Sequence, residues 1–292
     1  ERWAREGCID DKTDLNALFG YDEAGNFPLG GLGWCEAALC PAFTEEVLET
    51  RGEYEVVRDF AGRHVLYFKG RRSGFMPEYI GHPVKDRKTW EEQIKWRLDP
   101  SVPERYAATP ALLAAAKCAR ASGKIITQQL VGGYMYLRSL MGPEDLLYKF
   151  YDDPELIRDC MQTWLKLADT VIARHQEEVE IDELFLAEDI CYNVSSLISH
   201  DMIREILFPY YQELFSRVRA RQKRKDLYLQ VDTDGRIESV IDLYRSIGFN
   251  YFSPFEVASG SDVVAIRKKY PDILMSGGFD KRILAQGREA ID

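Results

Sequence analysis

The chain has 292 residues, of which 46% are apolar, and a formal net charge of −10. This is enough apolar material for one large core. The acidic balance excludes a nucleic-acid backbone or an anionic membrane as a partner, because both require clustered lysine and arginine.

The expected cellular location follows from three further features of the sequence. No apolar run is long enough to cross a bilayer, and no secretory leader is recognisable. Six cysteines are scattered without C-x-x-C pairing, which is typical of reduced, mostly buried thiols. Together these features predict a cytoplasmic protein.

The first part of the chain shows little regular pattern. Residues 1–50 are expected to be irregular, and the glycine-rich segment 25–34 lacks the G-x-G-x-x-G spacing and the preceding strand of a nucleotide-binding loop. Residues 53–70 alternate apolar and polar residues on both sides of a glycine, which predicts an antiparallel hairpin. An extended linker at 77–83 and a charged surface helix at 86–99 are expected to follow.

Helices and strands alternate in the rest of the chain. An alanine-rich helix at 110–121 precedes a strand at 124–131 that is rich in β-branched residues. Gly132 and Gly133 then form a turn into a helix. The backbone could approach a ligand closely at this turn, and a tight turn without a ligand is an equally good interpretation.

Two longer helices follow this turn. The first runs from 154 to 178, with Asp153 as its N-cap and one buried apolar stripe. The second begins after the cap Ser199, and Pro209 inside it predicts a kink or a break.

Four consecutive predicted strands carry acidic residues at their carboxyl ends. These residues are Glu188 and Asp189, Asp232 and Asp234, Glu256, and Asp280. Each one alone is typical of turn and cap chemistry. If the strands lie parallel in one barrel, however, the acids meet at one mouth. Carboxylates so placed repel one another and need a metal, bound cations or raised pKa values, so the group predicts a functional site.

Further polar and aromatic residues stand near the same strand ends. Arg138 could bind a substrate anion, and the rings of Tyr134 and Tyr192 could line an aromatic pocket. A solvated or packing role is the alternative for each of the three. His82 has no assigned role.

The alternation of strands and helices predicts an α/β fold with a parallel sheet and right-handed crossovers. We expect a (βα)8 TIM-type barrel with an N-terminal β-hairpin extension, built as one domain over residues 1–292. Residues 1–108 form the extension and residues 109–292 the regular βα units. An eight-stranded barrel needs at least one more strand, so the chain is expected to be shortened.

Five stretches of the sequence resemble the uroporphyrinogen decarboxylase superfamily, which includes the corrinoid-dependent methyltransferases. They read HPVKDRKTWEE (82–92), FYDDPELIRDCMQTW (150–164), AEDICYNVSSLISHDMIREILFPYYQEL (187–214), VDTDGRIESVIDLYRSIGFNYFSPFE (231–256) and GGFDKRILAQG (277–287). The resemblance implies a (βα)8 barrel with its site at the C-terminal mouth, and it makes a homodimer an expectation.

The decarboxylases of this superfamily have features that the sequence lacks. Their arginine-rich M-R-Q-A-G-R-Y segment and the aspartate of their F-S-D-I-L segment have no match here. The GGFD stretch resembles their G-N-L-D-P, which places Asp280 on the acid of that motif. Asp280 and Asp189 are therefore the best candidates for a decarboxylase acting on a tetrapyrrole or another carboxylated ring.

The coenzyme M methyltransferases of the superfamily bind zinc through an H-x-C pair after one strand. Asp232 and Asp234 occupy these two places. Two carboxylates could hold a divalent metal, either zinc or a harder ion. The resemblance thus implies a methyltransferase that moves a methyl group between a small methylated substrate and a corrinoid carried by a separate protein.

The preferred hypothesis is this methyltransferase. Asp232 and Asp234 would be acid or metal positions, and Glu188 and Asp280 would support them. Its substrate-binding residues would be Asp189, Arg138, Tyr134, Tyr192 and Glu256. The decarboxylase is the first alternative, and a non-catalytic binding protein on the same barrel is the second.

Overall fold

The computed structural model describes residues 2–10, 12–20, 25–73, 75–284, 286 and 288–291. Its main element is a six-stranded parallel sheet in the order β1-β6-β7-β8-β9-β10. The strands are β1 (Asn26–Leu29), β6 (Ile125–Val131), β7 (Glu183–Ala187), β8 (Tyr228–Asp232), β9 (Tyr251–Phe255) and β10 (Leu274–Gly277). An α/β fold with a parallel sheet is therefore confirmed.

The two edges of the parallel sheet are β1 and β10. Within the described residues these edges are not paired with each other, so closure into a barrel is not observed. The neighbouring strands β6 to β9 follow one another in sequence, with helices between them, as right-handed βαβ units require. Their carboxyl ends therefore lie along one edge of the sheet.

Strand β1 corrects the expectation that residues 1–50 are irregular. It pairs parallel with β6, from Asn26 opposite Ile125 to Leu29 opposite Gln128. It has four residues, one of which is a proline, and so gives almost no periodic signal. Proline is tolerated there because β1 is an edge strand, where one side needs no ladder hydrogen bonds.

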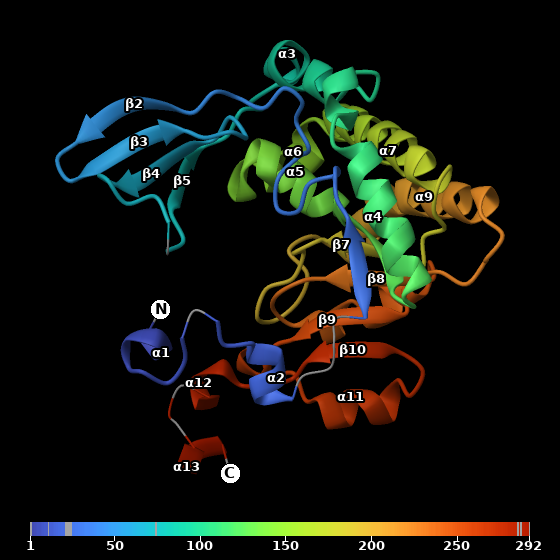
Figure 1. Ribbon diagram of the computed structural model, residues 1–292. Coiled ribbons are helices and arrows are strands. Elements are labelled where there is room, and N and C mark those ends of the chain that lie inside the picture. Colours follow the sequence, from blue (N-terminus) through green and yellow to red (C-terminus); the bar gives the residue numbers. More distant parts are fainter. Residues whose placement is uncertain are drawn as a thin grey trace.

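The predicted hairpin is confirmed as β3 (Tyr54–Arg58) and β4 (His64–Phe68). It lies inside a larger antiparallel sheet, with β2 (Glu46–Arg51) beside β3 and β5 (Glu78–Gly81) beside β4. The segment expected to be an extended linker therefore contributes a strand. Figure 1 shows this sheet standing apart from the parallel sheet, next to α6 (Pro143–Asp152).

Helices fill the connections between the parallel strands, and α4, α7 and α9 lie together on one side of the sheet (Figure 1). The longer ones are α4 (Thr109–Ala121), α5 (Gly133–Met141), α7 (Pro154–Gln176) and α9 (Phe208–Arg221). The shorter ones are α1 (Arg2–Arg5), α2 (Leu15–Phe19), α3 (Arg87–Thr89), α8 (His200–Met202), α10 (Ile241–Arg245), α11 (Val263–Lys269), α12 (Lys281–Leu284) and α13 (Arg288–Ile291). Single turns of 3₁₀- or π-helix are η1 (Trp90–Ile94), η2 (Lys95–Leu98), η3 (Pro103–Tyr106), η4 (Ile203–Leu207), η5 (Ile237–Ser239) and η6 (Val257–Ser259).

Two helix predictions can be compared with this list. The break expected at Pro209 is confirmed, because a π-helical turn ends at Leu207 and α9 then begins with the proline in its first turn. The helix expected at 86–99 is confirmed in part. The segment is helical in three consecutive pieces of different type, but it is not a surface helix, because its Trp90, Ile94 and Leu98 are buried in the core.

Asp182 connects three elements at the amino-terminal edge of the parallel sheet. Its carboxylate, in a residue only 4% exposed, accepts a hydrogen bond from the Ile126 N–H at 2.7 Å. It also forms ion pairs with Arg120 of α4 at 2.7 Å and with Arg224 before β8 at 2.9 Å. A carboxylate so buried is stable only with such partners.

Within the described ranges, no helix is both long and apolar enough to span a membrane.

We predict that Asp182→Ala lowers the free energy of unfolding by about 2–3 kcal/mol, because it leaves a buried N–H and two cations without their acceptor. The value lies below that for a fully buried pair, since both guanidinium groups reach solvent. Urea denaturation measures it. Asp272→Ala is the control. Its ion pair with Arg245 is exposed, so a loss below about 1 kcal/mol is expected. Equal losses in the two variants would contradict the prediction.

Candidate functional site

A cavity of about 530 Å³ lies at the carboxyl ends of β7 and β8. Its other side is lined by the loop after β1 and by residues from the antiparallel sheet and its connections. Its lining consists of Trp34, Cys35, Glu36, Arg63, Met76, Tyr79, His82, Met135, Arg138, Ser139, Pro143, Ala187, Asp189, Asp232 and Asp234. Four of the residues singled out in the sequence therefore meet in one pocket, namely Arg138, Asp189, Asp232 and Asp234.

Asp232 is the last residue of β8 and is half-buried in the pocket. Its Oδ1 accepts a hydrogen bond from Ser253 Oγ at 2.9 Å, and Ser253 Oγ in turn accepts one from Gln230 Nε2 at 2.7 Å. Burial raises the pKa of Asp232 to about 6, and the charges of Asp234 and Asp189 add to this effect. A measurable fraction of Asp232 is therefore protonated near neutral pH.

Asp234 lies nearer to the solvent than Asp232. Partial loss of contact with water raises its pKa, and the charges of Glu256 and Asp189 raise it further. Glu256 lies beside the same turn, where it accepts a hydrogen bond from the Gly235 N–H at 2.9 Å. Glu256 thus acts on the pocket through its charge and through the turn that presents Asp234.

Arg138 of α5 and Asp189 form an ion pair of 2.7 Å across the pocket. Arg138 Nη1 also donates to the Asp189 carbonyl at 3.3 Å. Asp189 has a φ of 42°, in the left-handed region that residues other than glycine rarely adopt. Its backbone turns away from the strand direction here, just after β7 ends.

Two lining residues, Arg63 and His82, come from parts of the chain that show no local signal for a site. Arg63 follows the hairpin turn, is 6% exposed, and pairs with Asp59 at 2.8 Å and Glu36 at 3.0 Å. Burial and the charges of Lys85 and Arg63 lower the pKa of His82 to about 4, so this histidine is neutral at pH 7. A charged residue in a turn is ordinarily solvated, so the place of Arg63 in the pocket cannot be recognised without the tertiary structure.

Cys35 is the only cysteine that lines this cavity among the described residues. Burial raises the pKa of its thiol to about 11, the charges of Glu36 and Asp189 raise it further, and the Arg138 charge opposes them. The thiol is therefore not ionised at neutral pH, and its ionisation depends on the charges around the pocket.

Glu188 is buried behind the pocket wall and does not line the cavity. Its Oε1 accepts hydrogen bonds from Tyr211 Oη at 2.6 Å and Tyr244 Oη at 2.8 Å, whereas its buried Oε2 has no partner among the described residues. Burial raises the pKa of Glu188 to about 7, against the effect of the two hydroxyl groups. Tyr134 is buried nearby, with burial raising its pKa to about 12.

The Gly132-Gly133 turn packs against this buried carboxyl group rather than against the cavity. A Cβ on Gly132 would lie 1.8 Å from Glu188 Oε2, and one on Gly133 would lie 2.8 Å from Tyr211 Oη. The Gly133 N–H donates a hydrogen bond to Tyr211 Oη at 2.7 Å. The close backbone approach that the glycines allow is therefore an approach to a side chain of the protein itself.

Two of the remaining predicted residues lie outside the cavity lining. Tyr192 is 45% exposed, and its carbonyl accepts a hydrogen bond from the Arg236 N–H at 2.8 Å. Asp280 pairs with Arg282 at 2.7 Å just before α12, and its bonds to Arg282 lower its pKa to about 2. Both contribute to loop structure beside the site.

The donor set of the pocket does not fit a metal ion well. Across the ranges that the structure describes, no three histidine, cysteine, aspartate or glutamate side chains converge as metal ligands. Asp232 and Asp234 alone provide too few protein ligands for the usual zinc, calcium or manganese site. A metal at these two acids stays a prediction.

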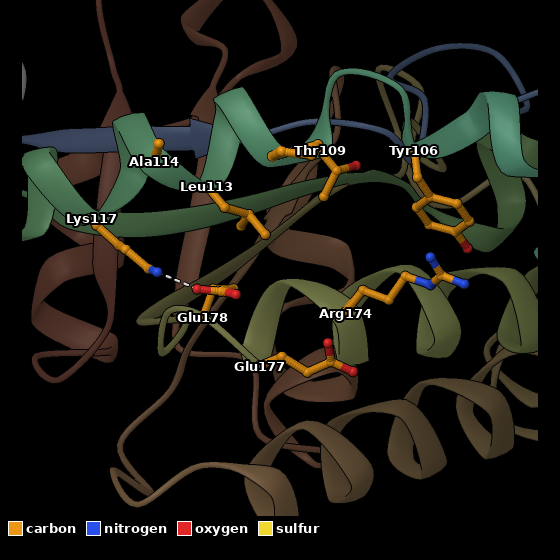
Figure 2. A pocket seen from close by; sticks show the side chains of 9 residues that line it. Tyr106, Thr109, Leu113, Ala114, Lys117, Arg174, Glu177 and Glu178 are labelled. Carbon is orange, nitrogen blue, oxygen red and sulfur yellow. Dashed lines mark hydrogen bonds and ion pairs between the residues drawn. The ribbon is translucent and has the colours of Figure 1, made fainter.

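A second cavity, of about 590 Å³, lies between α4 and α7 on the outer helix layer. Figure 2 shows the ion pair between Lys117 and Glu178 at one end and Arg174 beside Tyr106 at the other. The lining that the structure describes includes none of the residues predicted for the site. The pocket at the carboxyl ends of β7 and β8 is therefore the better candidate.

The comparisons with known proteins assign no family. No family model matches the chain, and no curated protein matches it. Among solved structures, it is similar to a methyltransferase from Methanosarcina mazei at 16% identity and a TM-score of 0.45, over 66% of this chain and 52% of that one. It is also similar to xylanase B from Clostridium stercorarium F9 at 14% identity and a TM-score of 0.34, over 57% and 54%. The chain spans about half the length of these two proteins.

We predict that Gly132→Ala lowers the free energy of unfolding by about 1–3 kcal/mol, because the new methyl group displaces the Glu188 carboxyl group. Chemical denaturation measures the loss. Gly30→Ala is a matched control, since its Cβ would meet nothing within 4 Å and its φ is not positive. A Gly132→Ala protein as stable as the Gly30→Ala protein would show that the contact is absent.

The raised pKa of Glu188 predicts a dependence of stability on pH. Because the folded state binds this proton more tightly than the unfolded state, stability falls as pH rises from about 4.5 to about 7. Glu188→Gln removes this part of the fall. We expect the variant to match the wild type near pH 4.5 and to exceed it above pH 7 by about 3 kcal/mol, in urea titrations across pH. A stability difference that does not change with pH would contradict this.

Proposed function

We propose that the protein is a methyltransferase that removes the methyl group from a small methylated compound, with Asp232 as the acid that protonates the leaving atom. The observation that carries the proposal is the position of Asp232. Its carboxyl group is half-buried in the wall of the cavity, and its pKa is raised to about 6. A general acid works best with a pKa close to the working pH.

The charges of the pocket support a neutral or cationic substrate. The lining holds four carboxyl groups (Glu36, Asp189, Asp232 and Asp234) and two guanidinium groups, so its net charge is −2 with all of them ionised and −1 when Asp232 carries its proton. Both guanidinium groups are already engaged, Arg63 with Asp59 and Glu36 and Arg138 with Asp189. A polycarboxylate substrate would meet uncompensated repulsion here. This disfavours the decarboxylase alternative, and no observation favours the non-catalytic alternative over an enzyme.

The reaction needs one proton and one nucleophile. The nucleophile attacks the methyl carbon, the bond between that carbon and the leaving oxygen breaks, and the electron pair of this bond stays on the oxygen. Asp232 donates its proton to that oxygen, so the products are an alcohol or phenol and a methylated nucleophile. The carboxylate of Asp232 regains its proton from solvent before the next turnover.

The finer parts of the proposal come from the sequence resemblance. They are a (βα)8 barrel of which the six parallel strands form part, a corrinoid on a separate protein as the methyl acceptor, and a homodimer. The aromatic and sulfur-containing groups of the lining, from Trp34, Tyr79, Met76 and Met135, suit a small apolar ring. We therefore place methylated aromatic ethers first among substrates.

We predict that the purified protein demethylates at least one aromatic methyl ether when free cob(I)alamin is supplied as the acceptor. Asp232→Asn should lower kcat/KM by about 10²–10⁴, because the departing oxygen then has no proton donor. Chromatography of the phenol and the absorbance of methylcobalamin measure the two products. In the wild type the rate should fall above about pH 6, as Asp232 loses its proton, and the variant should lack this fall.

The control for this experiment is Asp272→Asn, which removes an exposed acid outside the pocket. It should keep the rate and pH profile of the wild type. Absence of methyl transfer from every ether would overturn the proposed reaction. A full rate in Asp232→Asn would leave the reaction standing and remove Asp232 from it.

A further inference from the structure

Two adjacent residues after β7 contact the same helix at two points. Asp189 pairs with Arg138 inside the pocket at 2.7 Å. Glu188 points the other way and accepts the Tyr211 hydroxyl at 2.6 Å, and that hydroxyl accepts the N–H of Gly133 at 2.7 Å. Gly133 is the first residue of α5, and Arg138 lies further along it. The pair Glu188-Asp189 is therefore bonded to both the start and the middle of α5.

The backbone of this pair is held in an unusual conformation. Among the described residues, Asp189 is the one residue other than glycine with a positive φ, at 42°. The N–H groups of Glu188 and Asp189 both donate to the carbonyl of Asp232, at 2.8 and 3.1 Å. Such conformations persist where surrounding contacts fix them, and they concentrate at functional sites. The anchored side chain of Glu188 is one of the contacts that fix this one.

The surroundings of Glu188 show that its carboxyl group occupies an unfavourable place. It is fully buried, its Oε2 has no well-aligned donor in the described part of the chain although the Tyr134 N–H acts on the carboxyl group, and it requires a glycine at position 132. A buried, partly unsatisfied acid costs stability compared with an apolar residue of similar shape. The mechanism above does not use this group, so its presence calls for another explanation.

We propose that Glu188 is a positioning residue that holds α5, and with it Arg138, against Asp189 at the wall of the pocket. It acts through Tyr211 and Gly133 and does not touch the substrate. The inference rests on the pocket proposed as the active site, but its test requires no methyl transfer.

The thiol of Cys35 can report whether the wall of the pocket stays packed. It lines the same cavity, and the charges of Asp189 and Arg138 both act on its pKa. In a background with Cys8, Cys40 and Cys118 replaced by serine, it is the one thiol that is not buried, because Cys160 and Cys191 are enclosed. The pH profile of its alkylation by iodoacetamide, which is uncharged, then measures the ionisation of this thiol.

We expect Glu188→Ala to release the start of α5 and admit water to the pocket wall. Water at the wall lowers the Cys35 pKa, whereas withdrawal of the Arg138 charge raises it. Since burial is the first cause of the raised Cys35 pKa and the Arg138 charge a smaller one, the net profile should move to lower pH and the rate at a fixed pH should rise by about threefold or more. Tyr211→Phe removes only the link to Gly133 and should give a smaller rise. It also tests the proposal if Glu188→Ala does not fold. Glu188→Gln keeps the shape and the acceptor, so its profile should match that of the parent.

The matched control is Glu183→Ala. Glu183 is a buried acid at the other end of β7, bonded to Thr127 Oγ1 at 2.5 Å. This variant should lose stability but leave the Cys35 profile unchanged. The proposal is overturned if Glu188→Ala and Tyr211→Phe both keep the parent profile, or if Glu183→Ala shifts it equally. If the Cys35 profile shifts as expected but the protein transfers no methyl group, the proposed reaction is overturned and the positioning role of Glu188 stands.

Discussion

The pocket depends on the hydrogen bonds that join the ends of β7 and β8. The register places Ala187 opposite Asp232, and beyond this pair the next two N–H groups of the β7 side both donate to the Asp232 carbonyl. This arrangement brings Asp189 and Asp232 to the same cavity and sends Glu188 behind it. A slip of one residue would exchange the two faces, because successive side chains of a strand point in opposite directions. The backbone register of β7 and β8 therefore determines which acids reach the cavity and take part in the proposed chemistry.

Much of this site could be predicted from the sequence, because it follows from strand ends. The sequence shows acidic residues after buried strands, and the parallel sheet brings the carboxyl ends of these strands, and so the acids, close together. The structure brings Asp189, Asp232 and Asp234 together as this reasoning requires. Arg63, Tyr79 and His82 could not be predicted. Tyr79 lies on β5, Arg63 in the turn before β4, and His82 just after β5, and no local signal shows that this sheet and its connections face the carboxyl ends of the parallel sheet.

The same distinction holds for the fold. Segments with a strong local pattern could be predicted, whereas segments that depend on distant contacts could not. Segments with strong periodicity, such as the stripe of α7, have the predicted form, and its Leu156, Trp164 and Val171 are all buried. Strand β1 is recognisable only through its partner β6, since four residues with a proline give no period. Residues 86–99 are charged enough to suggest a solvated surface helix, yet Trp90 is fully buried and its Nε1 bonds to Asp159 at 2.9 Å. In both segments, contacts with distant parts of the chain decide the structure, and the local composition does not reveal it.

The contact between Gly132 and Glu188 also has a consequence for how this sequence can change. A Cβ at position 132 would collide with a carboxyl oxygen of Glu188 and would also lie 2.8 Å from the Cα of that residue. A shorter side chain at position 188 removes the first collision but leaves the second, because the Cα is present whichever residue stands there. Variation at these two positions is therefore expected to be one-sided. Position 188 can change while position 132 stays glycine, whereas a larger residue at position 132 requires the backbone itself to move.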